Sequence, residues 1–216
     1  MVRKLAILLD LDGTLVDTVP FILASVRHAF DGRPGPTDAE WIAGIGQPLR
    51  VQLARHARSP DDLDALVARY RAHQRLHHDR LTQPFPGAVE AVRALAGAGH
   101  AVAVVTGKLA EPAARTLAHV GLAPLVDALV GADSCPRHKP DPEPVLLALS
   151  RLGAGPGDAV FAGDSPVDVA AGRSAGVVTA GATWGAPDRA ALLAAAPSHL
   201  LDAPADLVAL AARLAG

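Results

Sequence analysis

Short runs of apolar residues, each ending in a turn, recur along the chain and predict buried β-strands. They occupy residues 5–10, 101–107, 127–133, 158–164 and 176–181. A run this short, bounded by turn-forming residues, is typical of a strand that is buried on both faces. Helix-length segments separate the later runs, at residues 87–99, 111–121 and 141–153. Strands that alternate with single helices predict an α/β fold with a Rossmann-like, doubly wound parallel sheet.

Residues 16–84 break this alternation, because they contain no convincing strand. Amphipathic helical patterns cover residues 19–30, 48–57 and 61–81, and the chain then returns through the Pro-rich turn TQPFPG. We therefore predict two domains. Residues 1–15 and 85–216 form an α/β core, and residues 16–84 form an inserted α-helical cap domain. The Ala-rich tail is expected to form terminal helices that cover the sheet.

The bulk composition narrows the classes of protein to consider. The chain has 216 residues, of which 50% are hydrophobic, so it can bury a sizeable core. Its net charge of −2, without a long run of one sign, favours neither a nucleic-acid partner nor a membrane partner. Cys135 is the single cysteine, which excludes an internal disulfide and predicts a cytoplasmic location. The apolar start is too short for an export signal, and no stretch could span a bilayer.

Charged and polar residues gather where the predicted strands end, which is where ligands bind in such sheets. They are Asp10, Asp12, Thr106, Gly107, Lys108, Lys139, Asp164 and Asp168. The chain has only three lysines, and two of them are in this group. We expect these carboxylate and ammonium groups to form one compact cluster.

This set of residues suits phosphoryl transfer. Neighbouring carboxylates resist joint ionisation unless a cation separates them, and Mg²⁺ binds through a few carboxylates together with phosphate oxygens. An ionised Asp10 can attack phosphorus, and Asp12 can act as general acid and base. Thr106, the amides around Gly107, and Lys139 would bind the transferring phosphoryl group.

The remaining acids at the strand ends extend the predicted metal site. Asp164 would complete it. Asp168 would either bind a metal-bound water or orient Lys139, and both roles stay open from the sequence.

Four ordered motifs carry a resemblance to a known family. They are DLDGTL at residues 10–15, VVTGK at 104–108, HKPDPEP at 138–144 and VFAGDSPVDVAAGRSAG at 160–176. Together they resemble the phosphatase branch of the haloacid dehalogenase superfamily. GIGQPLR at 44–50 and KPDPEPVLLAL at 139–149 are most similar to phosphoglycolate phosphatases and cytoplasmic pyrophosphatases.

The resemblance implies roles for the matching residues. Asp10 would be the nucleophile and Asp12 the acid/base, with Thr106 and Lys139 as phosphate ligands. Mg²⁺ would be held by Asp10, Asp164 and the Asp12 carbonyl. Gly107 replaces the Asn of many relatives, so a side-chain contact to the substrate is lost while the backbone amide remains. The expected activity is Mg²⁺-dependent hydrolysis of a small phosphorylated metabolite, such as a phosphoglycolate-like ester or pyrophosphate.

Several side chains of the predicted cap bear on specificity. Gln47 and Arg50 are expected to bind substrate, because arginine can bind an anion with two parallel hydrogen bonds. His73, His77 and His78 lie near one helix face. They are expected to form a solvated surface rather than a zinc site, because no further ligand is in the pattern. Cys135 is expected to be a structural or incidental thiol.

Other functions remain open from the sequence. A sugar phosphomutase would keep the phosphoenzyme but exclude water and bind a second phosphate. A carbon–halogen hydrolase would need neither Mg²⁺ nor an acid at Asp12, so Asp12 and Asp164 argue against it. A non-catalytic phosphoacceptor would have a long-lived aspartyl phosphate, which Asp12 disfavours. The expected partner is a small-molecule phosphate substrate, and the protein is expected to be a monomer or homodimer.

Overall fold

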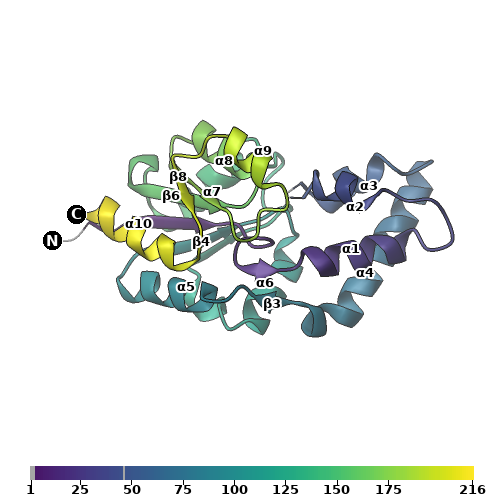
Figure 1. Ribbon diagram of the computed structural model, residues 1–216, viewed down its shortest axis with the longest axis horizontal. Coiled ribbons are helices and arrows are strands. Elements are labelled where there is room, and N and C mark those ends of the chain that lie inside the picture. The colour runs from purple at the N-terminus through teal and green to yellow at the C-terminus, as the bar shows by residue number, and fades with distance from the viewer. Residues whose placement is uncertain (1–2, 46) are drawn as a thin grey trace.

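A six-stranded parallel sheet forms the centre of the larger part of the molecule in the computed structural model, which describes residues 3–45 and 47–216 (Figure 1). Its order is β5-β4-β1-β6-β7-β8. The strands are β1 (Ala6–Leu9), β4 (Ala101–Val105), β5 (Ala128–Val130), β6 (Ala159–Gly163), β7 (Val178–Ala182) and β8 (His199–Leu201). The predicted fold class, a Rossmann-like α/β sheet, is confirmed.

Helices cover both faces of the sheet (Figure 1). One face packs against α5 (Ala88–Gly97), α6 (Ala110–His119) and α10 (Ala205–Ala215). The other face packs against α7 (Glu143–Leu152) and α8 (Pro166–Ser174). In β1, Ile7 and Leu9 belong to the first core, whereas Ala6 and Leu8 belong to the second. A strand that is buried on both faces shows no polar alternation, which explains the continuous apolar run in its sequence.

Four helices lie between residues 18 and 82 of the chain and form a separate layer beside the sheet (Figure 1). They are α1 (Val19–Ala29), α2 (Asp38–Ile42), α3 (Leu49–Ala54) and α4 (Pro60–Leu81). Their apolar faces form a hydrophobic cluster of their own, with Phe30, Trp41 and Leu66 among its buried members. We call residues 19–81 the helical segment.

Two short strands join the helical segment to the rest of the chain. β2 (Val16–Asp17) pairs antiparallel with β3 (Gln83–Pro84), so the outgoing and returning chains lie side by side. The expectation of no strand within residues 16–84 is wrong at these two places. Two residues are too few to show a hydrophobic period, so the sequence pattern does not reveal them.

The C-terminal tail also differs from the prediction. It contains α9 (Arg189–Ala194) and α10, as expected, but β8 lies between them and extends the sheet beside β7. The all-helical expectation for the tail is therefore wrong at β8, which has only three residues and one neighbouring strand. In the part of the chain that the structure describes, no helix is long and apolar enough to cross a membrane.

His100 anchors the chain just before β1. Its Nδ1 accepts a hydrogen bond of 3.1 Å from the backbone N–H of Leu5, and the side chain is buried. Burial, and then Lys4, lower the pKa of His100, so the neutral ring that can accept this bond is favoured in the folded protein.

His100→Ala is expected to lower the free energy of unfolding by about 1–3 kcal/mol, because it leaves the buried Leu5 N–H without this acceptor. Urea unfolding measures this difference. The unfolded histidine binds a proton near pH 6.5, before the folded one does, so its stabilising contribution is lost as the pH falls below that value. The difference between wild type and variant should therefore shrink between pH 7 and pH 5. A constant difference would contradict this role.

Candidate functional site

The carboxyl ends of three adjacent strands bring the predicted site residues together. Asp10 follows β1, Thr106 follows β4 and Asp164 follows β6, and β1 lies between the other two. The hydrogen bonds between neighbouring strands continue for one residue beyond the ends of β1 and β4. The Asp10 N–H donates to the Ala162 carbonyl at 2.9 Å, and the Thr106 N–H donates to the Val130 carbonyl at 2.9 Å. These backbone hydrogen bonds therefore hold the main chain of Asp10 and Thr106 in a fixed position at the edge of the sheet.

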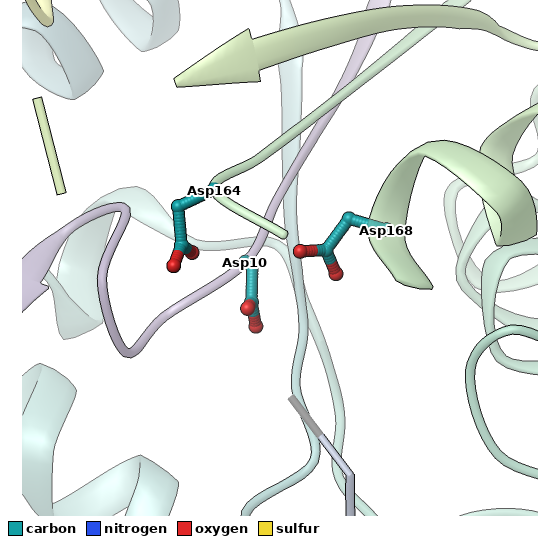
Figure 2. A group of neighbouring side chains, drawn as sticks. All are labelled: Asp10, Asp164 and Asp168. Atoms are coloured by element: carbon teal, nitrogen blue, oxygen red, sulfur yellow. The ribbon is translucent and has the colours of Figure 1, made fainter. Parts of the chain in front are cut away.

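Three buried carboxylates meet at this edge. Asp10, Asp164 and Asp168 each offer an oxygen atom, and these atoms lie within 4.8 Å of one another (Figure 2). Burial raises the pKa of Asp10 to about 7, although Lys139 acts in the opposite direction. Burial, followed by the charges of Asp10 and Asp168, raises the pKa of Asp164 well above its usual range. Negative charge is thus poorly compensated here by the protein alone, as expected of a cation site.

Two buried oxygens of this cluster are poorly satisfied. Asp164 Oδ2 accepts no hydrogen bond from the residues that the structure describes, and Asp10 Oδ1 meets Lys139 Nζ at 3.1 Å in an ion pair. The other oxygen of Asp164, Oδ1, accepts one from Thr14 Oγ1 at 2.8 Å. Buried carboxylate oxygens without donors suit a hard cation such as Mg²⁺, which prefers oxygen ligands.

Gly13 allows the loop after β1 to close on Asp164. Its φ is +86°, and a Cβ atom at this position would lie only 2.6 Å from Asp164 Cγ. Any side chain would therefore displace the Asp164 carboxylate, and the positive φ also favours glycine.

Lys139 supplies the positive charge inside the cluster. Its Nζ lies 2.6 Å from Asp168 Oδ1 and 3.1 Å from Asp10 Oδ1, and it donates a 3.2 Å hydrogen bond to the Val105 carbonyl. Burial alone would lower the pKa of Lys139, but Asp10 and Asp168 together outweigh burial and raise it. The ammonium group is therefore charged, and it faces Asp168, Asp10 and the Val105 carbonyl.

Asp168 is held against Lys139 from the start of α8. Its Oδ2 accepts hydrogen bonds from the backbone N–H of Ser165, at 3.1 Å, and from the Ser165 hydroxyl group. Its Oδ1 accepts the bond from Lys139. Both oxygens are thus engaged, which favours the orienting role for Asp168 over the metal role.

Asp12 lies outside the group of three carboxylates and has its own partners. Its Oδ1 accepts a 2.8 Å hydrogen bond from Lys108 Nζ and a 2.6 Å hydrogen bond from Thr18 Oγ1. Thr18 precedes α1, so Asp12 is linked to the point where the helical segment begins. Sequence reasoning placed Lys108 at a strand end without assigning it a partner. Its rarity as one of three lysines was the available signal.

A pocket of about 320 Å³ lies between this edge of the sheet and the helical segment. Its wall includes four core residues expected at the site, namely Asp10, Asp12, Thr106 and Gly107. Gln47 and Arg50 line the opposite side. Two segments of the chain therefore contribute predicted substrate residues to the same pocket.

Both of these side chains from the helical segment already have partners. Arg50 Nη1 forms an ion pair of 2.6 Å with Asp64 Oδ1. Gln47 Oε1 accepts a hydrogen bond of 2.6 Å from Arg55. Their contact with a substrate stays a prediction.

The histidines of α4 are not one solvated face, and the expectation is wrong for His78. This ring is buried, with Nε2 at 2.8 Å from Thr116 Oγ1 of α6 and Nδ1 at 2.6 Å from Asp79 Oδ1. The rings of His73 and His77 lie with centroids 4.5 Å apart and are tilted by 54° to each other. Within the described residues, no group with metal-ligand spacing contains a histidine.

Cys135 shows no sign of activation. Its Sγ donates a 3.2 Å hydrogen bond to the Arg137 carbonyl, and burial, followed by Glu143, raises the pKa of the thiol. A raised pKa keeps the sulfur protonated, which suits an incidental thiol.

Comparison with known proteins agrees with this geometry. The family model described as haloacid dehalogenase-like hydrolase matches residues 7–182. The chain is 38% identical over 208 residues to the pyrophosphatase PpaX of Bacillus velezensis, covering 95% of each chain. A crystal structure described as a predicted phosphoglycolate phosphatase from Haemophilus somnus superimposes with a TM-score of 0.89 at 25% identity, covering 97% of this chain and 99% of that one.

A crystal structure of a hydrolase from Pseudomonas syringae is also similar, with a TM-score of 0.85 at 25% identity. It covers 99% of this chain and 100% of its own. With the sheet, the strand-end residues and the match over residues 7–182 in agreement, the chain belongs to the haloacid dehalogenase-like hydrolases.

Proposed function

We propose that this hydrolase is a Mg²⁺-dependent phosphatase that acts on a small phosphorylated metabolite through an aspartyl-phosphate intermediate. The observation that carries the proposal is the group of buried carboxylates beside the charged Lys139, in which Asp164 Oδ2 accepts no hydrogen bond from the described residues and Asp10 Oδ1 faces Lys139. Asp10 also lines a pocket large enough for a small ligand. The similarity to PpaX supports phosphorus as the site of attack.

Asp10 and Asp164 would hold Mg²⁺, together with the backbone carbonyl of Asp12. The ion would supply positive charge that keeps Asp10 ionised and offsets the charge of the substrate phosphate. Asp168 would hold Lys139 in position through the 2.6 Å ion pair between them.

In the first step, a carboxylate oxygen of Asp10 forms a bond to phosphorus while the bond from phosphorus to the leaving oxygen breaks. Asp12 gives its proton to that leaving oxygen. Lys108 and Thr18 both bind Oδ1 of Asp12, which fixes the carboxyl group and leaves Oδ2 for the proton. Thr106, the amide of Gly107, and Lys139 bind the phosphoryl oxygens.

In the second step, Asp12 takes a proton from water. The water oxygen bonds to phosphorus as the bond from phosphorus to Asp10 breaks, which releases inorganic phosphate and restores the carboxylate.

Residues 16–84 would act as a cap domain over a core of residues 1–15 and 85–216. The paired strands β2 and β3 support these boundaries, because the two chain crossings lie next to each other. Movement of the cap would admit substrate and then shield the attack on phosphorus from water. Gln47 and Arg50 would contact the leaving group from the cap.

The proposed substrates are phosphoglycolate-like esters or pyrophosphate, and the proposed location is the cytoplasm. The single cysteine and the small net charge support an intracellular enzyme without a nucleic-acid partner. We propose a monomer or homodimer.

The test is a phosphate-release assay over a panel of phosphorylated metabolites, with Mg²⁺ and with excess EDTA. Release that needs Mg²⁺ is expected. Isomer formation without phosphate release would point to the mutase, and a stable phosphoenzyme without turnover would point to the phosphoacceptor. Full activity in EDTA would overturn the metal dependence.

A further inference from the structure

Two arginines of α4 face the pocket without a carboxylate partner. Arg71 and Arg75 both line the pocket, and they lie four residues apart on the helix. Neither forms an ion pair with a carboxylate in the part of the chain that the structure describes. Residues at this spacing are neighbours on one helix face.

The other cations of the pocket wall are already neutralised. Arg50 pairs with Asp64 at 2.6 Å, Lys108 with Asp12 at 2.8 Å, and Arg115 with Asp79 at 2.9 Å. Among the lysine and arginine side chains of the lining, Arg71 and Arg75 are therefore the two without an ion pair within the described residues, and Glu111 is a lining carboxylate that also forms none there.

Like charges four residues apart repel each other, so this arrangement is unfavourable by itself. An anion bound between the two groups would remove the repulsion. The planar guanidinium group matches carboxylate and phosphate oxygens with two parallel hydrogen bonds. The pair is thus suited to a carboxylate or a phosphate group.

The position of the pair separates it from the reacting phosphoryl group. Asp10, Thr106 and Lys139 belong to the sheet edge, whereas Arg71 and Arg75 belong to the helical segment on the other side of the pocket. An anion on α4 would therefore be carried by the far end of the substrate, which is the leaving group.

We propose, on the basis of the phosphatase function above, that the preferred substrates carry a second anionic group on the leaving group, and that Arg71 and Arg75 bind it. The substrate class is a phosphate compound whose leaving group ends in a carboxylate or in another phosphate. Compounds with an uncharged leaving group are poor substrates.

The experiment compares three substrates that differ at this end. Phosphoglycolate carries a carboxylate, pyrophosphate carries a second phosphate, and ethyl phosphate has the two-carbon chain of phosphoglycolate without the carboxylate oxygens and their charge. Wild type is expected to show kcat/KM at least about 100-fold higher for one or both anionic substrates than for ethyl phosphate. The substrate with the higher kcat/KM shows whether the arginine pair prefers a carboxylate or a second phosphate on the leaving group.

The variants are Arg71→Gln, Arg75→Gln and the double substitution. The double variant is expected to lose about 30-fold or more in kcat/KM for the preferred anionic substrate, mainly through KM, and to stay within about threefold for ethyl phosphate. Arg80→Gln is the control, because it removes the same charge from α4 at a residue outside the lining of this pocket. It should match wild type on all three substrates.

A second readout does not depend on turnover. In an Asp10→Asn background with Mg²⁺, calorimetry with phosphoglycolate and pyrophosphate should show binding at least about 10-fold weaker when both arginines are replaced. Thermal unfolding of each variant establishes that it is folded.

Equal losses for all three substrates, or no loss of anion affinity in the double variant, would overturn the anion site. Failure of the phosphatase function gives a different result, namely no phosphate release from any substrate by the wild type, and the calorimetric comparison then still tests the arginine pair.

Discussion

Asp10→Asn is expected to lower kcat for phosphate release by about 10,000-fold or more, because the substitution removes the nucleophile but keeps the shape of the side chain. An amide oxygen is far less nucleophilic than a carboxylate and cannot form the aspartyl phosphate. A discontinuous phosphate assay with Mg²⁺ measures the rate, and circular dichroism establishes that the variant keeps the fold.

Asp158→Asn is the matched control for this experiment. Asp158 is an exposed acid that pairs with Arg3, away from the pocket. It should stay within about twofold of wild type, because surface substitutions have small effects. Retention of full activity by Asp10→Asn would refute the nucleophilic role.

Asp10→Asn is also expected to be more stable than wild type above pH 7 when no divalent ion is present. The pKa of Asp10 is raised from 3.8 in its ordinary state to about 7 in the fold. Its contribution to stability is therefore complete below pH 3.8 and is lost as the pH rises through 7. Asparagine has no proton to lose, so the gap in melting temperature should open between pH 3.8 and about pH 7 and stay constant at higher pH.

Mg²⁺ is expected to raise the melting temperature of the wild type by about 5–10 °C when it is present at about 100 times its dissociation constant. The ion would bind the folded carboxylate cluster but not the unfolded chain, where Asp10 and Asp164 are far apart. EDTA should reverse the shift. Differential scanning calorimetry at several Mg²⁺ concentrations measures it.

Asp164→Asn is expected to abolish most of this Mg²⁺-dependent shift and most of the phosphatase activity together. Its Oδ2 is buried and accepts no hydrogen bond from the described residues. Asp158→Asn should retain both the shift and the activity. An unchanged Mg²⁺ shift in Asp164→Asn would place the ion elsewhere.

Much of the site follows from local sequence. The apolar run before Asp10 predicts a strand buried on both faces, and the turn residues after it place Asp10 at the carboxyl end. The same pattern places Thr106 and Asp164. Parallel strands end at one edge of a sheet, so local patterns are sufficient to bring these residues to the same side of the molecule.

The short elements were not predictable in this way. β2, β3 and β8 have two or three residues each, so they show no measurable hydrophobic period. Each is defined by pairing with another strand: β2 pairs with β3, which is distant in sequence, and β8 pairs with β7.

The sequence by itself determined the fold class, the family motifs and the chemical types available at the strand ends, since these depend on local periodicity and residue identity. Only the tertiary structure decided which charges are neutralised. It paired Lys108 with Asp12, buried His78 against Thr116, and left Arg71 and Arg75 on the pocket wall without an ion pair to the residues that the structure describes. These outcomes depend on the strand order and on the packing of α4 beside the core. Both arise from contacts between distant parts of the chain, which no local pattern records.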